Sequence, residues 1–354
     1  MITSIPHSRP FVGNAEKAAC GKVILSRQLS QGPCVEMLEH ELSSVAGHKF
    51  GICVSSGTAA LYCALKALGV SPGNSVVIPS YVCTALLNAV ILAGADPVLS
   101  DVDPATGNMD PHSARKAVRR ATKAIIVPHL FGVPAAAQEI ERETGIPVIE
   151  DCAQCVGTTN GGEKIGSLTT ISVFSFYATK LLCAGEGGMA ATSDARLAAK
   201  LADMREYDNR DRYVPSFNFK LSDVHAAIAL VQLKKLPAAI RRRKAVAREY
   251  LNGLKPVSPR VRLPDSTAHA SSVFYRFVAL VDQPISGILR KSEKSGVSCR
   301  RPIYGPLHHY LKKTGFPGTD EIYKRAISLP IYPDLTQNEI SQVKQVFLRA
   351  IGAR

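Results

Sequence analysis

The hydrophobic residues of this chain fall into short continuous runs, separated by longer segments with helical patterning. Four such runs are Val76–Ile78, Pro97–Leu99, Ala124–Val127 and Val148–Ile149. Strands that are apolar throughout are typical of a parallel sheet buried on both faces, in which helices form the crossovers. The pattern therefore predicts an α/β protein with a mainly parallel sheet.

A second feature of the pattern is one long segment rich in alanine and leucine, Ser222–Leu254, which predicts a single long helix. Prolines that include Pro259 follow it and mark a change in the character of the chain. With 354 residues, 46% of them hydrophobic, the chain is long enough for two domains. We predict a large domain over residues 1–250 and a smaller C-terminal α/β domain over residues 251–354.

The N-terminal residues Met1–His7 do not resemble a signal peptide, because no basic start is followed by an apolar core. The longest apolar stretch, Val76–Ala93, is interrupted by Pro79 and Asn88, so we expect no membrane span. These features predict a protein of the cytoplasm that does not associate with membranes.

The nine cysteines are scattered along the chain, several of them in core-like segments, as suits a reducing cytoplasm. Cys152 and Cys155 have CxxC spacing, but neither a second pair nor paired histidines accompany them. We therefore predict no metal site.

The formal net charge of +14 suits either a nucleic-acid surface or sites for phosphorylated substrates. Basic residues cluster at Arg119–Arg120, Arg241–Lys244 and Arg300–Arg301, and the second cluster is expected to be the solvated face of a helix. Because no RNA-binding module or DNA-reading motif accompanies these clusters, we do not expect nucleic acid as a partner.

One lysine, Lys180, is a candidate catalytic residue. Lys180 follows the strand-like run Ile171–Phe176 and precedes the glycine-rich run Gly185–Gly188. It is therefore expected at the end of a strand, where glycines let other groups approach the backbone closely. A partly desolvated lysine has a lowered pKa and can form a Schiff base with an aldehyde cofactor. Taken alone, the run is equally consistent with a lysine that caps the strand.

Two carboxylates end the apolar run Pro147–Asp151. At the C-terminal end of a parallel strand, Asp151 would point into the crevice where such folds bind ligands, and Glu150 would lie on the opposite face. If the ligand is pyridoxal 5'-phosphate (PLP), a carboxylate there keeps the pyridine nitrogen protonated. Alternatively, Asp151 caps the next helix.

The segment Ile52–Gly69 has the pattern of a strand, a tight turn and a helix. Gly57 allows the turn, Thr58 offers a hydroxyl, and the helix N-terminus presents free N–H groups to an anion. The segment is a candidate phosphate site, although a Ser-Gly-Thr turn by itself is weak support.

The phosphate site, the carboxylate and the lysine follow one another along a chain of alternating strands and helices. From about Gln28 to about Val346, this chain resembles the DegT/StrS-type family of PLP-dependent sugar aminotransferases, which have the aspartate-aminotransferase (type I) fold. The motifs that carry the resemblance are Leu29–Pro33, Ser55–Thr58, Pro128–Gly132, Ile149–Gln154, Phe174–Lys180, Gly185–Met189, Phe217–Ser222 and Ser328–Pro333.

The resemblance implies a role for each matching residue. Lys180 would bind the aldehyde of PLP and later carry the proton, Asp151 would pair with the pyridine nitrogen, and Gln154 would lie against the ring near its phenolic oxygen. Asn218 would reach the cofactor phosphate of the other subunit, which implies a homodimer with shared active sites. The phosphate within the subunit would be held by Gly57, Thr58, Ala59 and Ser175.

The resemblance also implies the reaction, a transamination from an amino acid, L-glutamate by family analogy, to a keto sugar. The expected acceptor is a nucleotide-linked 3- or 4-keto-6-deoxyhexose. Related sugar dehydratases have histidine in place of the lysine, so Lys180 argues against that activity. A cyclitol or aminobenzoate-type aminotransferase fits nearly as well. The alternative of another class is a non-catalytic regulatory or nucleic-acid-binding protein on the same fold.

Three segments depart from the family pattern. Cys83 stands where an aromatic ring usually stacks on the cofactor, and Tyr81 is the other candidate for that place. Lys220 stands where arginine is frequent, and Pro302–Tyr304 replaces a His-Tyr-Pro run. Because these segments are expected near the substrate, they leave its identity open.

Overall fold

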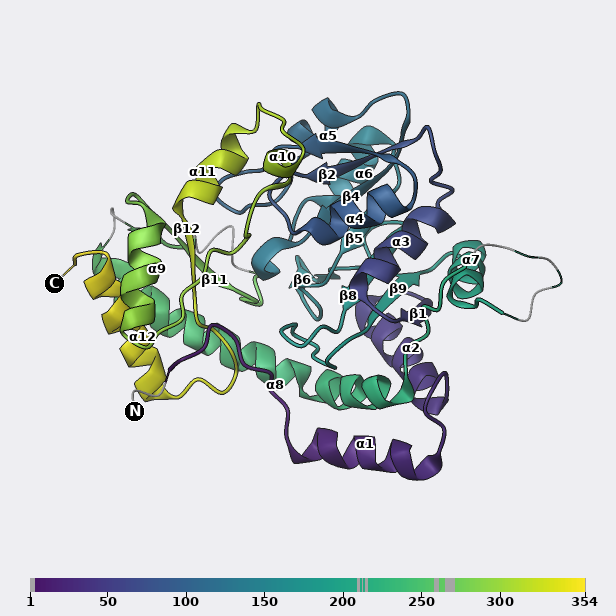
Figure 1. Cartoon of the computed structure of the whole chain (residues 1–354), viewed down its shortest axis with the longest axis horizontal. Helices are drawn as coiled ribbons and strands as arrows, with labels where there is room; N and C mark the ends of the chain where they lie inside the picture. Colours follow the sequence, from purple (N-terminus) through teal and green to yellow (C-terminus); the bar gives the residue numbers. More distant parts are fainter. Residues whose placement is uncertain are drawn as a thin grey trace.

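A seven-stranded sheet forms the centre of the molecule, and a three-stranded sheet lies in its C-terminal part (Figure 1). The computed structural model describes residues 4–208, 211, 213, 216–257, 261–264 and 271–353. Pro259, one of the prolines at the expected domain boundary, lies outside these residues.

The strands are short, and most of those in the large sheet have five residues. In chain order they are β1 (Phe50–Val54), β2 (Ser75–Pro79), β3 (Asp96–Ser100), β4 (Thr122–Pro128), β5 (Val148–Asp151), β6 (Thr159–Asn160), β7 (Glu163–Lys164), β8 (Ile171–Ser175), β9 (Gly188–Thr192), β10 (Val261–Arg262), β11 (Phe277–Val281) and β12 (Ala326–Leu329).

The large sheet has the strand order β1-β9-β8-β5-β4-β2-β3. Strand β9 runs antiparallel to its neighbours β1 and β8, and the other pairings are parallel. The four apolar runs of the sequence are β2 to β5, so the prediction of a mainly parallel sheet is confirmed. Strand β5 lies in the middle of the sheet and ends at Asp151.

The helices of the described residues cover both faces of the large sheet and pack on the small one (Figure 1). Within these residues, no helix combines the length and the apolar character that crossing a membrane requires. In chain order the helices are α1 (Asn14–Ser26), α2 (Pro33–Ala46), α3 (Gly57–Ala67), α4 (Thr84–Leu92), α5 (Pro111–Ala117), the 3-10 helix η1 (Leu130–Gly132), α6 (Ala137–Thr144), α7 (Ala195–Arg205), α8 (Asp223–Leu254), the 3-10 helix η2 (Lys255–Val257), α9 (Ile285–Lys294), α10 (Leu307–Tyr310), α11 (Pro317–Arg325) and α12 (Gln337–Ala350).

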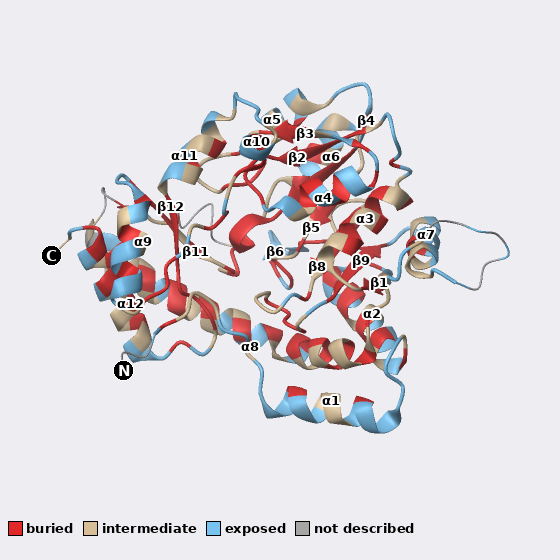
Figure 2. Ribbon diagram, in the orientation of Figure 1, coloured by how far each residue is buried: buried red, intermediate tan, exposed pale blue. Residues whose placement is uncertain are grey.

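The central strands are buried from both sides (Figure 2). Adjacent residues of one strand belong to different hydrophobic clusters. Val77 of β2 packs in one cluster, and Ile78 packs in another on the opposite face of the sheet. Both side chains are fully buried. This double burial explains why the strands are apolar throughout rather than alternating.

The predicted long helix is α8, which begins one residue after Ser222 and extends to Leu254. Ser222 is its N-cap, and the Ser222 hydroxyl accepts a hydrogen bond from the His225 N–H at 3.3 Å. The second half of α8 packs with β10, β11, β12, α9 and α12 in one hydrophobic cluster, which also includes Ile5. Because α8 crosses residue 250 without a break, the domain boundary at 250/251 stays a prediction.

The basic run Arg241–Lys244 on α8 differs from the expected solvated face. The Arg243 side chain is buried, and its guanidinium donates hydrogen bonds to the carbonyls of Phe274, Tyr275 and Ile331 at 3.0–3.3 Å. Burial lowers the pKa of Arg243 to about 10. The expectation was wrong at this position, because main-chain carbonyls from later in the chain cover one turn of the helix.

Candidate active site

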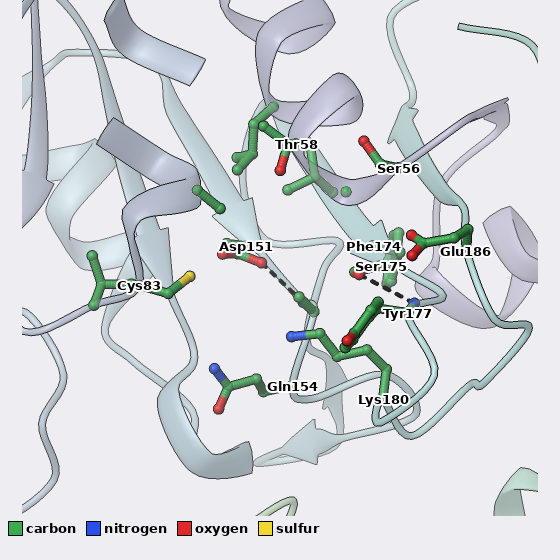
Figure 3. Close-up of a pocket in the computed structure, with 16 residues that line it drawn as sticks. Ser56, Thr58, Cys83, Asp151, Gln154, Phe174, Ser175, Tyr177, Lys180 and Glu186 are labelled. Carbon is green, nitrogen blue, oxygen red and sulfur yellow. Dashed lines mark hydrogen bonds between the residues drawn. The ribbon is translucent and has the colours of Figure 1, made fainter. Parts of the chain in front are cut away.

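A pocket of about 220 Å³ opens at the carboxyl ends of β5 and β8, beside the N-terminus of α3 (Figure 3). This is the edge of a parallel sheet at which doubly wound folds bind ligands. Six of the predicted site residues line the pocket, namely Gly57, Thr58, Asp151, Gln154, Ser175 and Lys180. The structure thus gathers groups from three separate motifs of the sequence into one cavity.

Lys180 lies in the turn that follows β8, where its N–H donates a hydrogen bond to the Tyr177 carbonyl at 2.8 Å. Its side chain extends into the pocket toward Asp151 and Gln154 (Figure 3). The glycines after it adopt positive φ angles, 90° at Gly185 and 127° at Gly187, which side-chain-bearing residues rarely adopt. The turn therefore depends on the glycine-rich run that the sequence places next to the lysine.

Asp151 is the last residue of β5, and its Oδ1 accepts a hydrogen bond from the Ala153 N–H at 3.0 Å. Burial raises the pKa of the Asp151 carboxyl, and the charge of Lys180 and the Ala153 N–H offset part of that effect. A buried carboxylate gains most from a cationic partner, because an opposite charge nearby favours its ionised form. The site is therefore suited to a protonated ring nitrogen.

Gln154 is held in one orientation. Its side-chain Oε1 accepts a hydrogen bond from the Phe131 N–H at 2.8 Å, and a backbone N–H can only donate. The amide NH2 of Gln154 is consequently left to face the pocket as a hydrogen-bond donor (Figure 3). A donor at this place suits a phenolate oxygen of a bound ring.

The start of α3 forms the other wall of the pocket. A Cβ added at Gly57 would lie 2.8 Å from the Ser175 Cβ, and one added at Gly188 would lie 2.6 Å from the Gly57 nitrogen. Glycine at both positions therefore lets the helix N-terminus approach the end of β8 closely. The first-turn N–H groups and the Ser175 and Thr58 hydroxyls make this wall suited to a phosphate.

Two predicted cofactor residues do not line the pocket. Ala59 is buried, and its N–H already donates to the N-cap hydroxyl of Ser56 at 3.1 Å, which leaves the N–H groups of Gly57 and Thr58 ahead of it as candidates for phosphate. Asn218 is exposed, and its Oδ1 accepts a hydrogen bond from the Lys220 N–H at 3.2 Å. The roles of both residues stay predictions.

Of the two candidates for the ring-stacking position, Cys83 lines the pocket and Tyr81 does not. Tyr81 is fully buried and packs edge-on against Phe131, with 6.3 Å between the ring centroids. Cys83 is the exposed cysteine of the nine, and its side chain faces the space between Asp151 and Gln154 (Figure 3). Burial nevertheless raises the pKa of the Cys83 thiol, since the pocket walls surround it.

Sequence reasoning missed several residues at the site. Ser56 and Glu186 line the pocket, and each lies inside a motif that the sequence singles out. Their position next to predicted site residues was the signal that could have identified them. The Tyr275 ring lies beside Lys180, with 5.4 Å between the Lys180 Nζ and the ring centroid. Burial by itself raises the pKa of Tyr275, but Lys180, Arg276 and a hydrogen bond from Thr179 outweigh it and lower that pKa. Nothing in the sequence pattern connects Tyr275 with Lys180.

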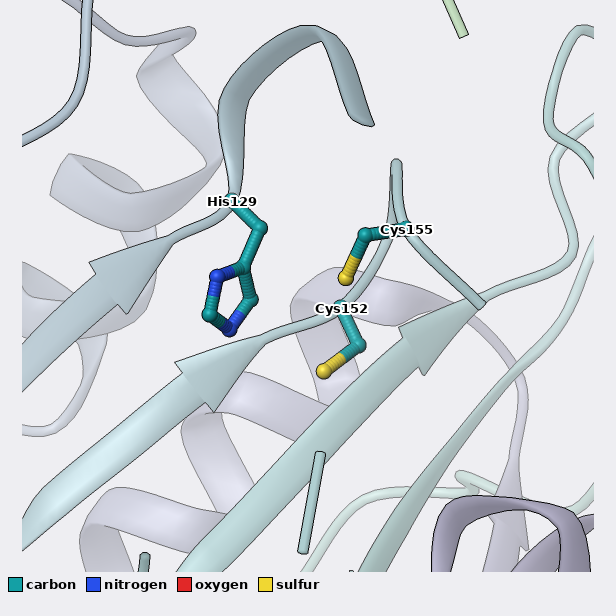
Figure 4. Close-up of side chains that lie close together, drawn as sticks. All are labelled: His129, Cys152 and Cys155. Atoms are coloured by element: carbon teal, nitrogen blue, oxygen red, sulfur yellow. The ribbon is translucent and has the colours of Figure 1, made fainter. Parts of the chain in front are cut away.

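The CxxC pair lies next to the pocket, close to a histidine (Figure 4). The His129 Nε2 and the thiols of Cys152 and Cys155 lie within 4.8 Å of one another, and all three residues are buried. The Ala135 N–H donates to the His129 Nδ1 at 2.9 Å, so in the neutral ring the proton must be on Nε2. Burial lowers the pKa of His129 to about 3, which keeps the ring neutral. A protonated Nε2 cannot coordinate a metal, and these residues therefore do not fit one.

The fold and the pocket together define a PLP-dependent aminotransferase of the type I fold. Residues 10–347 match the model of the DegT/DnrJ/EryC1/StrS aminotransferase family. The chain belongs to this family.

Solved structures agree with this assignment. The aminotransferase TlmJ from Streptoalloteichus hindustanus is 30% identical, with a TM-score of 0.93 over 98% of this chain and 99% of that chain. DesV from S. venezuelae is 29% identical, with a TM-score of 0.87 over 95% of this chain and 94% of that chain. Spr1654 from Streptococcus pneumoniae in its PLP form is 23% identical, with a TM-score of 0.91 over 99% of both chains, a likeness that shows the fold alone.

Enzymes of this family use PLP, and the pocket fits that cofactor. PLP has an aldehyde, a phosphate and a pyridine nitrogen, and each needs a different partner. The pocket offers an amine from Lys180, the N-terminus of α3 with Ser175, and the half-buried carboxylate of Asp151 on separate walls. The phosphate would be held where Gly57 and Gly188 let the N-terminus of α3 come close to the end of β8.

Proposed function

We propose that this aminotransferase moves an amino group from L-glutamate to a nucleotide-linked 3- or 4-keto-6-deoxyhexose. The observation that carries the proposal is the convergence of Lys180, Asp151 and the α3 N-terminus in one pocket of a chain of this family. The resemblance of its motifs to sugar aminotransferases supports a sugar as the acceptor. The formal charge of +14 supports an anionic substrate such as a nucleotide sugar, because a cationic surface attracts anions.

In this proposal Lys180 holds the cofactor and moves the proton. Its Nζ would hold the cofactor through the aldehyde, and as a free amine beside the bound amino acid it would take up the α-proton. When bound, PLP supplies the electron-withdrawing ring that makes that proton acidic. The protonated Lys180 would then be the group placed to return that proton, and the same residues would serve the acceptor half of the reaction.

Asp151 and Gln154 orient the ring and set its charge. The Asp151 carboxylate would accept a hydrogen bond from the ring N–H and so favour the protonated, cationic form of that nitrogen. The NH2 of Gln154 donates to the phenolate oxygen. Because both side chains are fixed by backbone N–H groups of Ala153 and Phe131, the ring would meet them in one orientation.

The phosphate is held at the start of α3. The Gly57 and Thr58 N–H groups and the hydroxyls of Thr58 and Ser175 donate to its oxygens, and the positive end of the helix dipole stabilises the dianion. In the proposed homodimer, Asn218 of one subunit donates to the phosphate held by the other. The exposed aromatic side chain of Phe217 beside Asn218 supports a covered surface there, since it is 54% exposed in the single chain.

We also propose that the protein is cytoplasmic. All nine cysteines are free in the structure, including the CxxC pair, which suits a reducing compartment.

The proposed donor is tested by incubating the PLP-loaded enzyme with L-glutamate and no acceptor. A ping-pong enzyme releases one 2-oxoglutarate per active site and stops, while the visible absorption of the bound cofactor is lost. Adding a nucleotide-linked keto sugar should then restore the absorption and yield the amino sugar. A panel of cyclitol ketones serves as the competing acceptor class. Restoration by a cyclitol ketone alone would refute the sugar proposal, and a cofactor that ignores glutamate would refute the donor.

A further inference from the structure

The structure gathers a second group of potential ligands away from the pocket, on two short helices of the C-terminal part (Figure 1). His308 and His309 belong to α10, and Asp320 lies in the first turn of α11. None of the three lines the pocket. We propose that these three side chains bind one divalent transition-metal ion of the zinc class.

The distances suit a single small ion. The Asp320 Oδ1 lies 3.3 Å from the His308 Nε2 and 3.9 Å from the His309 Nε2, and the three ligand atoms lie within 4.8 Å of one another. Zinc bonds to imidazole nitrogen and carboxylate oxygen are about 2.0–2.2 Å long, so tetrahedral neighbours stand roughly 3.3–3.6 Å apart. Small rotamer changes of the partly exposed His309 and Asp320 side chains close the remaining gap.

The buried ligand has a partner that permits metal binding. The Nδ1 of His308 lies 2.7 Å from the hydroxyl of Ser80, which is itself fully buried. The Ser80 oxygen also accepts a hydrogen bond from the His308 backbone N–H at 3.3 Å, and a hydroxyl oxygen has a second lone pair. The imidazole can therefore take the tautomer in which Nδ1–H donates to that lone pair and Nε2 offers its own to an ion. Metal-binding histidines are typically oriented by such a hydrogen bond from the other ring nitrogen.

His129 shows why this partner matters. Its Nδ1 faces the Ala135 N–H, which can only donate, and that contact fixes the proton on the Nε2 that faces the two cysteines. The two histidine groups therefore differ in the chemistry of one hydrogen-bond partner. The group with His308 can bind an ion, and the group with His129 cannot.

The site would leave one coordination position open and join two helices. His309 and Asp320 are 48% and 42% exposed, while His308 is 5% exposed, so the fourth tetrahedral position faces solvent and would hold water. Two ligands come from α10 and one from α11, so the ion would tie these helices together. Through the hydrogen bond between His308 and Ser80, the ion would also hold the segment that follows β2. Cys83 of the pocket lies three residues further along that segment.

The test is a calorimetric titration of zinc chloride into the PLP-loaded, tag-free enzyme. The wild-type chain should bind one ion per subunit, and His309→Ala and Asp320→Asn should each weaken binding at least tenfold. His40→Ala, which removes an exposed histidine of α2, is the matched control and should bind as the wild type does. Neither His309 nor Asp320 is expected to disturb folding on replacement, because both are partly exposed.

A further variant tests the role of the buried hydroxyl. Ser80→Ala removes the partner of the His308 Nδ1 and should weaken zinc binding about 10- to 100-fold, the usual effect of losing an outer hydrogen bond to a ligand. If wild-type enzyme binds no zinc, or if both His309→Ala and Asp320→Asn bind it as tightly as wild type, the proposal is wrong. In the second case another group, such as the exposed thiol of Cys83, holds the ion.

Discussion

The Nζ of Lys180 lies 5.4 Å from the ring centroid of Tyr275, so the predicted catalytic lysine rests against an aromatic side chain from the C-terminal part of the chain. The carbonyl of Tyr275 is in turn held by the buried guanidinium of Arg243 at 3.2 Å. Helix α8 thereby braces the segment that supports the lysine.

Replacing Tyr275 with leucine should lower kcat without loss of cofactor. The ring would stabilise the ammonium that Lys180 becomes when it takes up a proton, a contact that gains about 0.5–2 kcal/mol, so the loss should be roughly 2- to 30-fold. Tyr275→Phe keeps the ring and is the matched control, which should retain most of the activity. Steady-state kinetics at saturating PLP would measure both. A leucine variant with the wild-type kcat would show that the ring does not position Lys180.

Cys83 should be the cysteine that reacts first with a thiol reagent. It is exposed in the pocket, Cys20 and Cys34 are half-buried, and the other six are buried. Labelling of the apoenzyme with a maleimide should therefore modify Cys83 most rapidly, and prior loading with PLP should slow that reaction. Peptide mapping by mass spectrometry identifies the site, and Cys83→Ser should remove the fast phase. Fast labelling that PLP leaves unchanged would place Cys83 away from the cofactor.

Glu150 should make the stability of the protein depend on pH. Its carboxyl is fully buried, and burial raises its pKa from 4.5 to about 8, although the backbone N–H groups of Gly166 and Leu168 offset part of the effect. Because the folded state holds this proton more tightly than the unfolded state, the contribution to stability is full below pH 4.5 and is lost as the pH rises to about 8. The loss approaches at most about 1.4 kcal/mol per pH unit.

Urea unfolding of the apoenzyme at several pH values measures this effect. Glu150→Gln cannot ionise and should flatten the decline between about pH 5 and 8, whereas Glu163→Gln, at an exposed position of β7, should leave the decline unchanged. Equal pH profiles for wild type and Glu150→Gln would show that the buried carboxyl does not titrate as stated.

Shared active sites predict that two inactive variants complement each other. A dimer that combines Lys180→Ala with Asn218→Ala subunits has one site with both changes and one with neither. Random exchange of subunits should therefore restore about a quarter of the wild-type active sites. Activity is measured before and after the two proteins are mixed under conditions that allow exchange. A mixture no more active than the average of its components would contradict a shared site.

Much of the fold could be predicted, because the burial of a strand or helix determines which of its positions are hydrophobic, and the sequence shows those positions directly. Val77 and Ile78 point to opposite faces of the same strand and are both fully buried, so the run had to be apolar throughout. The helix from Ser222 to Leu254 is likewise marked by its composition and by a serine that caps it. Elements of this kind depend on neighbours in the sequence, which the pattern shows.

What could not be predicted depends on contacts between distant parts of the chain. Arg243 has the pattern of a solvated helix residue, and only the folded chain brings the carbonyls of Phe274 and Ile331 over it. Tyr275 meets Lys180 for the same reason. Six residues that line the pocket could be predicted, since each stands in a motif with a recognisable chemical task. The residues that position these side chains, such as Tyr275, stand in no recognisable motif.

Borohydride trapping shows whether Lys180 is the amine that holds the cofactor. Borohydride reduces the C=N bond between PLP and its lysine to a stable amine, and digestion followed by mass spectrometry then locates the labelled peptide. We predict one label per chain, on the peptide that contains Lys180, and none on Lys180→Ala. A label on another lysine of the wild-type enzyme, or no label after PLP has bound, would contradict the assignment.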